Sequence, residues 1–351
     1  MPVTAPQGDD ELAASFTRLD DEVLAELVRA GWGIVPLAVH RLATERDDSA
    51  VIEHAGGRHV LKVAHPLDDA GVLDLQCTAL RHAARRDPGL PLPSLTPDRD
   101  GAVLRLVTGA HGEDRRARLL TYLPGAPLDY RTTDTGQRRS IGRMVGRLSQ
   151  SLTDLEHPSS DRVLAWDLQQ TGRLRPLLSY VADDEVRHLV EVELDAYEQR
   201  VGPALAATRQ QILHNDANAD NLLVDHGVEE FVTGILDFGD IVRTSVAADL
   251  AIAMTYAVGA DGSLERHHVD PWSAPYDVAH GYLEARGLTE DERSLLPALV
   301  RTRLAQRLLV NSWLAASDPG NAHYTARWVS VTGRMLRRLA GTPSPVERGE
   351  A

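Results

Sequence analysis

The amino-acid sequence predicts an α+β fold with two lobes, a small β-rich lobe at the amino end and a large helical lobe after it. Three observations indicate this. Short apolar or alternating runs separated by turn signals dominate the first third of the chain, helical spacing dominates from about residue 135, and a cluster of three short apolar runs at 211–240 interrupts the helices. We expect the small lobe at residues 1–122, a hinge at 123–128 and the helical lobe at 129–351.

The elements of the small lobe follow in order along the chain. Residues 20–33 have apolar side chains at helical spacing, acids in front and a glycine at the end, which predicts a leading helix at about 20–30. The runs PLAVHRL, SAVIEH and RHVLKVA predict an antiparallel meander, with a turn at Gly56-Gly57. Residues 74–86 return to helical spacing, and AVLRLVTG and RARLLTYL predict a hairpin around AHGED.

Composition and charge limit the classes of function. No run reaches the roughly 20 apolar residues that a membrane span needs, and the first residues lack the basic start and apolar core of a signal peptide. The single cysteine, Cys77, excludes an intramolecular disulfide and a cysteine metal cluster, and it fits a cytoplasmic setting. The net charge of −14 argues against nucleic acid as a partner and suits a cationic small molecule. We expect a monomer or a homodimer.

The segment ILHNDANADNLLVD places a polar loop between two apolar runs, where rigid scaffolds present functional groups. It contains His214, Asp216 and Asn221, and the next apolar run ends at Asp237 in the sequence LDFGD. If the two later runs pair as a hairpin, Asn221 and Asp237 lie near the same end of it. Amide and carboxylate oxygens are ligands that Mg²⁺ takes, while the other carboxylate is free to act on a proton or as a nucleophile. Each residue alone is more often a turn former, but the joint spacing is improbable by chance.

These motifs carry a resemblance to a known family. HNDANADN and LDFGD resemble the catalytic loop and the metal-binding motif of aminoglycoside phosphotransferases and choline-kinase-like enzymes, which are related in logic to those of protein kinases. The stretches LATERDDSAVI, HVLKVAHP, LLTYLPG, WDL, HNDAN and ILDFGDIVRTSVAADLAIA are most similar to the hydroxylysine-kinase-like branch. They extend from about residue 40 to residue 255, so the resemblance covers both lobes and implies a bilobal protein-kinase-like fold.

The resemblance also implies an activity. The chain would use ATP (or GTP) and Mg²⁺ to move the γ-phosphate to a hydroxyl of a small polar molecule, such as a hydroxylated amino acid or an amino alcohol. Two alternatives stay open: a kinase that inactivates an aminoglycoside or nucleoside antibiotic, and a kinase-like binding module without catalysis. Asp216 would accept the proton of the substrate hydroxyl, and Asn221 and Asp237 would hold Mg²⁺.

Lys62 is the only lysine among the 37 basic residues, and it matches the lysine that kinases direct at the α- and β-phosphates. A compact ammonium acts there as a point charge, which the planar fork of arginine does not replace well. In kinases a glutamate on the next helix orients this lysine, but no glutamate lies between Lys62 and Arg86. Asp74 or Gln76 would take that role, and we favour Asp74.

The remaining candidates are less specific. His214 is expected to hold the catalytic loop through a backbone hydrogen bond rather than to act as a base. Asp249 resembles a family aspartate that braces the same loop; it could also cap the following helix, and both roles could hold. The turn before the second strand would cover the phosphates, unless it is a plain solvated turn, and it contributes Thr44, Arg46 and Ser49. The hinge would offer backbone groups to adenine at Thr121, Tyr122 and Leu123. Candidate substrate contacts, with core packing as the alternative for the tryptophan, are Trp166, Asp167, Asp240 and Arg243.

Overall fold

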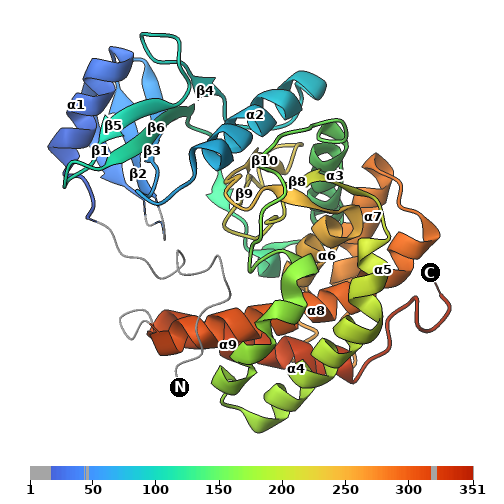
Figure 1. The fold of residues 1–351 in the computed structure, drawn as a ribbon. Helices are drawn as coiled ribbons and strands as arrows, with labels where there is room; N and C mark the ends of the chain where they lie inside the picture. Colours follow the sequence, from blue (N-terminus) through green and yellow to red (C-terminus); the bar gives the residue numbers. More distant parts are fainter. Residues whose placement is uncertain (1–16, 43, 45–46, 318–321, 351) are drawn as a thin grey trace.

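A small lobe built on an antiparallel sheet lies against a large, mostly helical lobe (Figure 1). The computed structural model describes residues 17–42, 44, 47–317 and 322–350 of the chain. The arrangement confirms the predicted α+β fold with a β-rich amino-terminal part and a helical carboxyl-terminal part.

The small lobe contains one sheet in which every strand pair is antiparallel. The strand order is β1-β2-β3-β6-β4, and β5 also pairs with β6. The predicted meander of the first three strands and the predicted hairpin of β5 with β6 are both confirmed. The strands of this sheet are β1 (Pro36–Arg41), β2 (Asp48–His54), β3 (Gly57–Val63), β4 (Leu95–Thr96), β5 (Arg105–Thr108) and β6 (Asp114–Thr121).

Two helices complete the small lobe. Helix α1 (Asp21–Trp32) lies where predicted and ends at Gly33, whose φ of 72° favours glycine. Its buried face packs on the sheet, so each large apolar side chain there contributes about 1.5–3 kcal/mol of burial free energy. Helix α2 (Ala70–Arg86) begins four residues before the predicted start, because the carboxylate of Asp69 accepts the N–H groups of Gly71 and Val72 and caps it.

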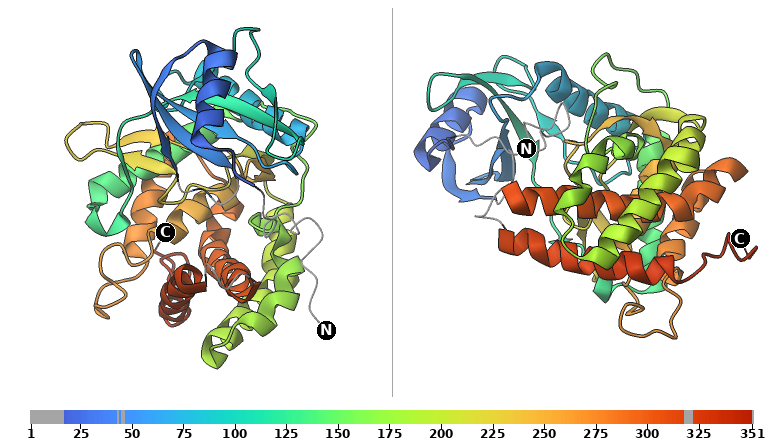
Figure 2. Two further views of the ribbon diagram at one scale, coloured as in Figure 1. Left: turned by 90° about the vertical axis from the view of Figure 1, so that its left-hand side faces the viewer. Right: turned by 60° about the horizontal axis from the view of Figure 1, so that its bottom comes forward.

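The large lobe is a helical assembly around one hydrophobic core. Helices α3 and α7 approach each other so closely that a Cβ atom on Gly142 would lie 1.9 Å from the carbonyl oxygen of Val278. Helices α8 and α9 form a long hairpin that extends to a position below the small lobe (Figures 1 and 2). The helices of this lobe are α3 (Thr135–Ser151), α4 (Asp184–Ala196), α5 (Gly202–Ala206), α6 (Val246–Tyr256), α7 (Ser273–Ala285), α8 (Glu290–Ser317) and α9 (Ala322–Ala340), with 3₁₀ helices at Tyr130–Thr132 and Leu168–Tyr180 and a π-helical turn at Tyr197–Val201.

The strands of the large lobe lie beside α2, where the two lobes meet (Figure 1). The predicted hairpin is confirmed, since β9 (Leu222–Val224) pairs antiparallel with β10 (Val232–Ile235), and β7 (Ala126–Pro127) extends that sheet. A second, two-stranded sheet joins β8 (Gln210–Leu213) to β11 (Val242–Ser245). Strand β11 was not predicted from the sequence, because its residues VRTS alternate in polarity over only four positions.

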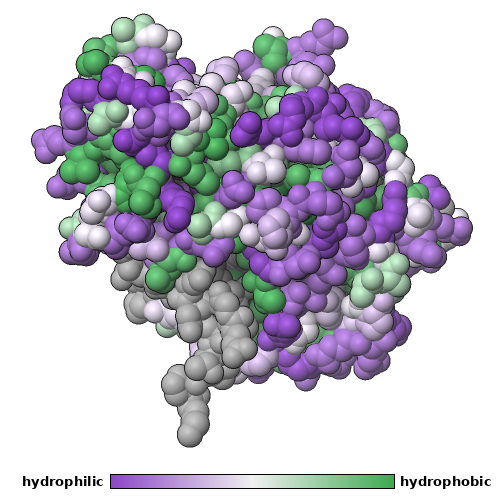
Figure 3. All heavy atoms as spheres, turned by 45° about the horizontal axis from the view of Figure 1, so that its top comes forward, coloured by the Kyte–Doolittle hydropathy of each residue, from purple (hydrophilic) through white to green (hydrophobic). Residues whose placement is uncertain are grey.

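The division of the chain at 123–128 remains a proposal, because α2 shares the core of the large lobe. Its buried face, which includes Leu75 and Leu80, belongs to the same apolar cluster as Leu148 and Leu213. The face shown in Figure 3 is mainly hydrophilic, with apolar groups scattered among the charged ones. Among the described residues, none of the helices combines the length and the apolar content that a membrane span requires.

Candidate active site

A polar loop at 214–221 connects β8 to β9, and His214 fixes its start. The imidazole Nε2 lies 2.9 Å from the carbonyl oxygen of Leu236, and the N–H of Asp216 donates to Nδ1 at 3.3 Å. Because a carbonyl oxygen only accepts and an N–H only donates, these partners assign a neutral imidazole that carries its hydrogen on Nε2. The imidazole ring of His214 also packs edge to face on the ring of Phe238, with 4.8 Å between the ring centres. The hydrogen bond to the backbone is the one expected of His214 from the sequence.

Asp249 braces the same loop from helix α6. Its Oδ1 accepts the backbone N–H of Asn215 at 3.0 Å, and Asn215 has a φ of 63°, in the left-handed region. Burial raises the pKa of the Asp249 carboxyl, which is 1% exposed. The cap of α6 is Ser245, whose hydroxyl accepts the N–H of Ala247, so Asp249 is not the cap of this helix.

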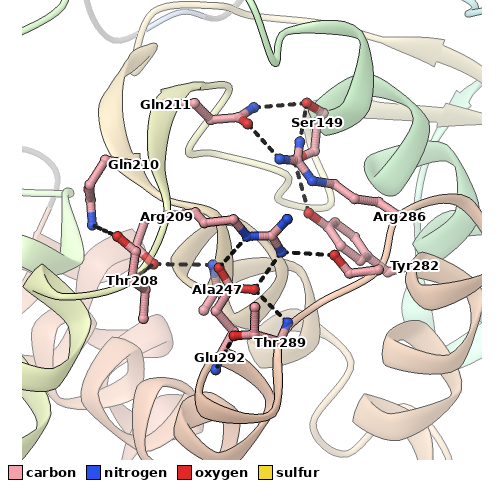
Figure 4. Close-up of polar contacts among 12 residues, drawn as sticks. Ser149, Thr208, Arg209, Gln210, Gln211, Ala247, Tyr282, Arg286, Thr289 and Glu292 are labelled. Carbon is pink, nitrogen blue, oxygen red and sulfur yellow. Dashed lines mark hydrogen bonds and ion pairs between the residues drawn. The ribbon is translucent and has the colours of Figure 1, made fainter.

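A polar network, largely buried, ties β8 to the neighbouring helices (Figure 4). Gln211 donates from Nε2 to the carbonyl oxygen of Ser149 at 2.8 Å and accepts from Arg286 Nη2 at 2.5 Å, while Arg286 Nη1 donates to the hydroxyl of Ser149. Arg209, one residue before β8, pairs with Glu292 in the first turn of α8 at 2.7 and 2.5 Å. The strand that leads into the loop at 214–221 is therefore tied to α3, to the end of α7 and to α8, which fixes the position of the loop.

Asp216 lies within the loop, and two amide groups donate to one of its carboxylate oxygens. Nδ2 of Asn218 and Nδ2 of Asn221 each lie 2.7 Å from its Oδ2, and Arg303 Nη2 lies 3.8 Å from its Oδ1. Burial raises the pKa of Asp216, and the charge of Arg303 acts in the opposite direction. The amide nitrogen of Asn221 donates to Asp216. The amide oxygen of Asn221, Oδ1, has no hydrogen-bond partner among the described residues.

Asp237 follows β10 and faces the small lobe. The N–H of Leu236 donates to the carbonyl oxygen of Asn221 at 2.8 Å, so Asn221 and Asp237 lie at the same end of the hairpin, as predicted. The Asp237 Oδ1 accepts the N–H of Gly239 at 2.9 Å, and its Oδ2 lies 3.1 Å from the Nζ of Lys62. The ammonium of Lys62 holds the pKa of Asp237 below its ordinary value, although burial acts to raise it.

Lys62 on β3 therefore forms an ion pair across the two lobes. A second carboxylate, that of Asp47, lies 3.2 Å from its Nζ. Burial acts to lower the pKa of Lys62, but the charges of Asp237 and Asp47 outweigh it, so the pKa lies above its ordinary value. Ser49 is opposite Lys62 in the pairing of β2 with β3, and Asp47 is two residues from Ser49, on the same face of the strand.

The prediction that Asp74 or Gln76 orients Lys62 is wrong in this structure. Asp74 is 61% exposed and pairs with His157 at 3.1 Å, because the face of α2 that carries it is turned toward the loop that follows α3. Gln76 is buried, and its Oε1 has no hydrogen-bond partner. The partner supplied by the small lobe is Asp47, which the sequence analysis did not single out. The alternation of the predicted strand SAVIEH against RHVLKVA was the signal that could have identified it.

The turn before β2 does not hold the predicted hydroxyls of Thr44 and Ser49 where they could cover phosphates. The hydroxyl of Thr44 donates to the carbonyl oxygen of Asp47 at 2.5 Å, so it is used within the turn. Ser49 is fully buried, and its hydroxyl has no partner. Neither hydroxyl is presented toward a ligand. Arg46 lies outside the described residues.

The hinge offers fewer free backbone donors than expected. The N–H of Thr121 donates to the carbonyl oxygen of Ser94 at 2.9 Å, and the N–H of Tyr122 donates to that of Arg58 at 3.4 Å. The guanidinium of Arg58 also lies 3.9 Å from the centre of the Tyr122 ring. Of the three predicted positions, only Leu123 keeps an N–H group without a partner among the described residues.

Two predicted substrate contacts are turned away from the loop. The Asp167 carboxylate is 1% exposed and accepts from the Thr244 hydroxyl at 2.8 Å and from the Gln169 N–H at 3.1 Å, so it caps a 3₁₀ helix. Arg243 points outward from β11, because its strand neighbours are buried, and it pairs with Asp161 at 3.1 Å. The prediction that Asp167 and Arg243 contact the substrate is therefore wrong in this structure, because both side chains are used elsewhere.

The other two predicted contacts lie close to Asp216. Burial, followed by the charge of Asp216, raises the pKa of Asp240 to about 7, and no hydrogen bond to the Asp240 side chain exists among the described residues. The ring of Trp166 lies 5.1 Å from the guanidinium of Arg303, whose Nη1 donates to the Trp166 carbonyl oxygen at 2.5 Å. Arg303 was missed from the sequence, where it is one of several arginines in a long helical run.

Known proteins similar to this chain include kinases of small molecules. The chain is 28% identical over 340 residues to the hydroxylysine kinase of Danio rerio, covering 93% of this chain and 92% of that protein. It is 28% identical over 237 residues to the homoserine kinase of Zymomonas mobilis, covering 66% of this chain and 68% of that protein. The amicoumacin kinase structure solved with AMP-PNP and Ca²⁺ superimposes with a TM-score of 0.68 at 14% identity, covering 93% of this chain and 96% of that chain. The kinase relatives support a small-molecule kinase. The model of the phosphotransferase enzyme family matches residues 41–288, so the chain belongs to that family.

Proposed function

We propose that the chain is an ATP- and Mg²⁺-dependent phosphotransferase that moves the γ-phosphate to a hydroxyl of a hydroxylated amino acid or an amino alcohol. One observation carries this proposal: Lys62 Nζ from the small lobe lies 3.1 Å from Asp237 Oδ2 of the large lobe, beside the loop that holds Asp216. Phosphoryl transfer depends on positioning and charge compensation around the phosphates, and these groups converge on one point.

The side chains fit a magnesium ion that arrives with the nucleotide. Among the described residues, no cluster of three or more His, Cys, Asp or Glu side chains could hold a metal by itself. The Oδ1 of Asn221 and the carboxylate of Asp237 would supply two oxygen ligands, and Mg²⁺ usually takes one or two protein ligands beside substrate phosphates. The ion would neutralise charge that develops on the phosphates. Lys62 would exchange its contact with Asp237 for contacts with the phosphate oxygens.

Asp216 would orient the acceptor hydroxyl and take its proton. The amides of Asn218 and Asn221 hold one carboxylate oxygen at 2.7 Å each, which leaves the other oxygen on the side of Arg303. A positioned base of this kind contributes roughly 10²- to 10⁴-fold to the rate. His214 and Asp249 would act through the loop rather than on the substrate.

The relatives favour a hydroxylated amino acid over an antibiotic as acceptor. The hydroxylysine kinase of Danio rerio matches along nearly the whole chain at 28% identity, whereas the amicoumacin kinase, at 14% identity, supports the fold alone. The test is ADP release with ATP, Mg²⁺ and a panel of hydroxylated amino acids, amino alcohols and aminoglycosides. We expect acceptor-dependent release that Asp216→Asn lowers by about 100-fold or more, while Asp220→Asn, the same change at an exposed position in the same loop, retains activity. Equal turnover by the wild type and Asp216→Asn would contradict the proposal.

A further inference from the structure

Two arginines four residues apart on α8, Arg303 and Arg307, lie buried on the face of the helix that approaches the Asp216 loop. They are 1% and 6% exposed, although charged side chains are rarely buried without a paired charge. Positions four apart lie on one side of a helix, about 6 Å from each other along its axis. The two arginines differ in their partners, since Arg303 lies near the carboxylate of Asp216 and Arg307 has no carboxylate partner among the described residues.

The guanidinium of Arg303 is held in place by several partners. Its Nη1 donates to the Gln306 Oε1 at 2.7 Å and to the Trp166 carbonyl oxygen, and its Nη2 lies 3.8 Å from the Oδ1 of Asp216. Its guanidinium is thereby held at a fixed place next to the candidate base.

Arg307 has no carboxylate partner among the described residues. Its guanidinium lies 4.6 Å from the centre of the Tyr256 ring, and its Nη1 is buried without a hydrogen-bond partner. Burial lowers the pKa of Arg307, and the charge of Arg303 acts in the same direction, whereas that of Asp216 opposes it. A buried guanidinium with an unused donor is costly to the folded protein unless a ligand supplies the missing anion.

The side chain of Asp240, a carboxyl group that also lies near Asp216, has the opposite deficit. Its carboxylate is partly buried beside Asp216 and has no hydrogen bond among the described residues. One guanidinium without a carboxylate partner and one carboxyl group without a hydrogen bond, counted among the described residues, therefore lie near the candidate base. This arrangement is complementary to a molecule that carries both a carboxylate and an ammonium in addition to its hydroxyl.

We propose that Arg307 binds the carboxylate of an amino-acid acceptor and that Asp240 binds its ammonium, so that the enzyme selects hydroxylated amino acids over amino alcohols. This inference rests on the proposed function and narrows its acceptor. One helical turn separates Arg307 from the arginine beside Asp216, and a chain of a few carbons between hydroxyl and carboxylate spans such a distance.

The test compares acceptors that differ only in the carboxylate. Homoserine is paired with 3-aminopropan-1-ol, and 5-hydroxylysine with 1,5-diaminopentan-2-ol, and the ratio of the kcat/KM values within each pair is measured. A ratio does not depend on how much of a variant folds. The wild type should prefer the amino acid, and Arg307→Met should lower the ratio on the order of 100-fold. Arg307→Lys keeps the charge but loses the planar fork of the guanidinium. Its ratio should therefore lie between those of the wild type and Arg307→Met.

Two further variants separate specific from general effects. Arg293→Met makes the same change at an exposed position of α8 and should leave the ratio at the wild-type value. Asp240→Asn should lower kcat/KM for both members of a pair, because both carry the ammonium. A ratio unchanged in Arg307→Met, or a wild type that prefers the decarboxylated acceptor, overturns the inference while the kinase activity stands. If no acceptor is phosphorylated, the proposed function fails, and calorimetric titration with each pair still decides whether Arg307 binds the carboxylate.

Discussion

Replacing Lys62 with methionine removes the one ammonium at which the two lobes meet. The side chain is 13% exposed and lies 3.1 Å from Asp237 and 3.2 Å from Asp47. Without it these two carboxylates face each other, and among the described residues the remaining cation paired with Asp47 is Arg118, at 3.7 Å. The pKa of Asp237 should rise toward its ordinary value, because the ammonium of Lys62 is the main cause of its depression.

The effects of this change on stability and on catalysis should differ in size. Asp237 is 43% exposed, so the ion pair in the nucleotide-free protein is screened by solvent and contributes no more than about 1 kcal/mol to the free energy of unfolding. In the nucleotide complex the same ammonium would contact phosphate oxygens, and a hydrogen bond between charged groups contributes about 1.5–3 kcal/mol. That energy corresponds to roughly 10- to 150-fold in kcat/KM for ATP.

The assay is ADP release at saturating acceptor with varied MgATP, combined with thermal unfolding of the same preparations. Lys62→Met should lose at least about 10-fold in kcat/KM for ATP with only a small change in Tm. Lys62→Arg should restore the ion pair and the Tm but not kcat/KM, because the planar fork does not replace a point charge among the phosphates. Recovery of kcat/KM by Lys62→Arg would refute this reasoning, as would full activity of Lys62→Met.

Three further predictions follow from contacts elsewhere in the structure. Asp74→Asn should keep kcat/KM for ATP within about two-fold of the wild type, because Asp74 is exposed and does not pair with Lys62; a loss like that of Lys62→Met would restore the original assignment. The two hydrogen bonds from Arg147 hold the pKa of Asp87 below its ordinary value, so the carboxylate stabilises the fold at neutral pH. Asp87→Asn should therefore lower the free energy of unfolding by about 1 kcal/mol at pH 7, and the difference should vanish as the pH falls below about 4. Gly142→Ala should lower it by about 3 kcal/mol in a denaturant titration, because the added Cβ would overlap the backbone of α7.

The polar loop at 214–221 could be predicted from the sequence because its determinants are local. The spacing of His214, Asp216 and Asn221 between two apolar runs fixes the strand–loop–strand unit, and the end of the next apolar run places Asp237 at the same edge. Neither inference depends on how distant elements pack. The same reasoning gave the meander and the leading helix of the small lobe.

The partner of Lys62 and the buried arginines could not be predicted in this way. Which residue reaches Lys62 depends on the rotation of α2 and on the register of β2 against β3, and the structure selects Asp47 over Asp74. The burial of Arg303 and Arg307 depends on what packs against α8. In the sequence they are charges on a helix, which are usually solvated.

Arg115 and Lys62 differ in the number of bonds that each would have to release to change partners. Arg115, two strands away from the turn that carries Asp47, donates to Asp48 at 2.9 Å and to the carbonyl oxygens of Val63 and Ala64 at 3.0 and 2.7 Å, so three groups would have to be released together. A fork held in this way fixes the end of β3 and is unsuited to exchange. Lys62, one residue before that end, makes two point contacts that a phosphate oxygen can replace one at a time. Arg115 is therefore suited to a fixed structural contact, and Lys62 to a position where, under the proposed function, the partner would change during turnover.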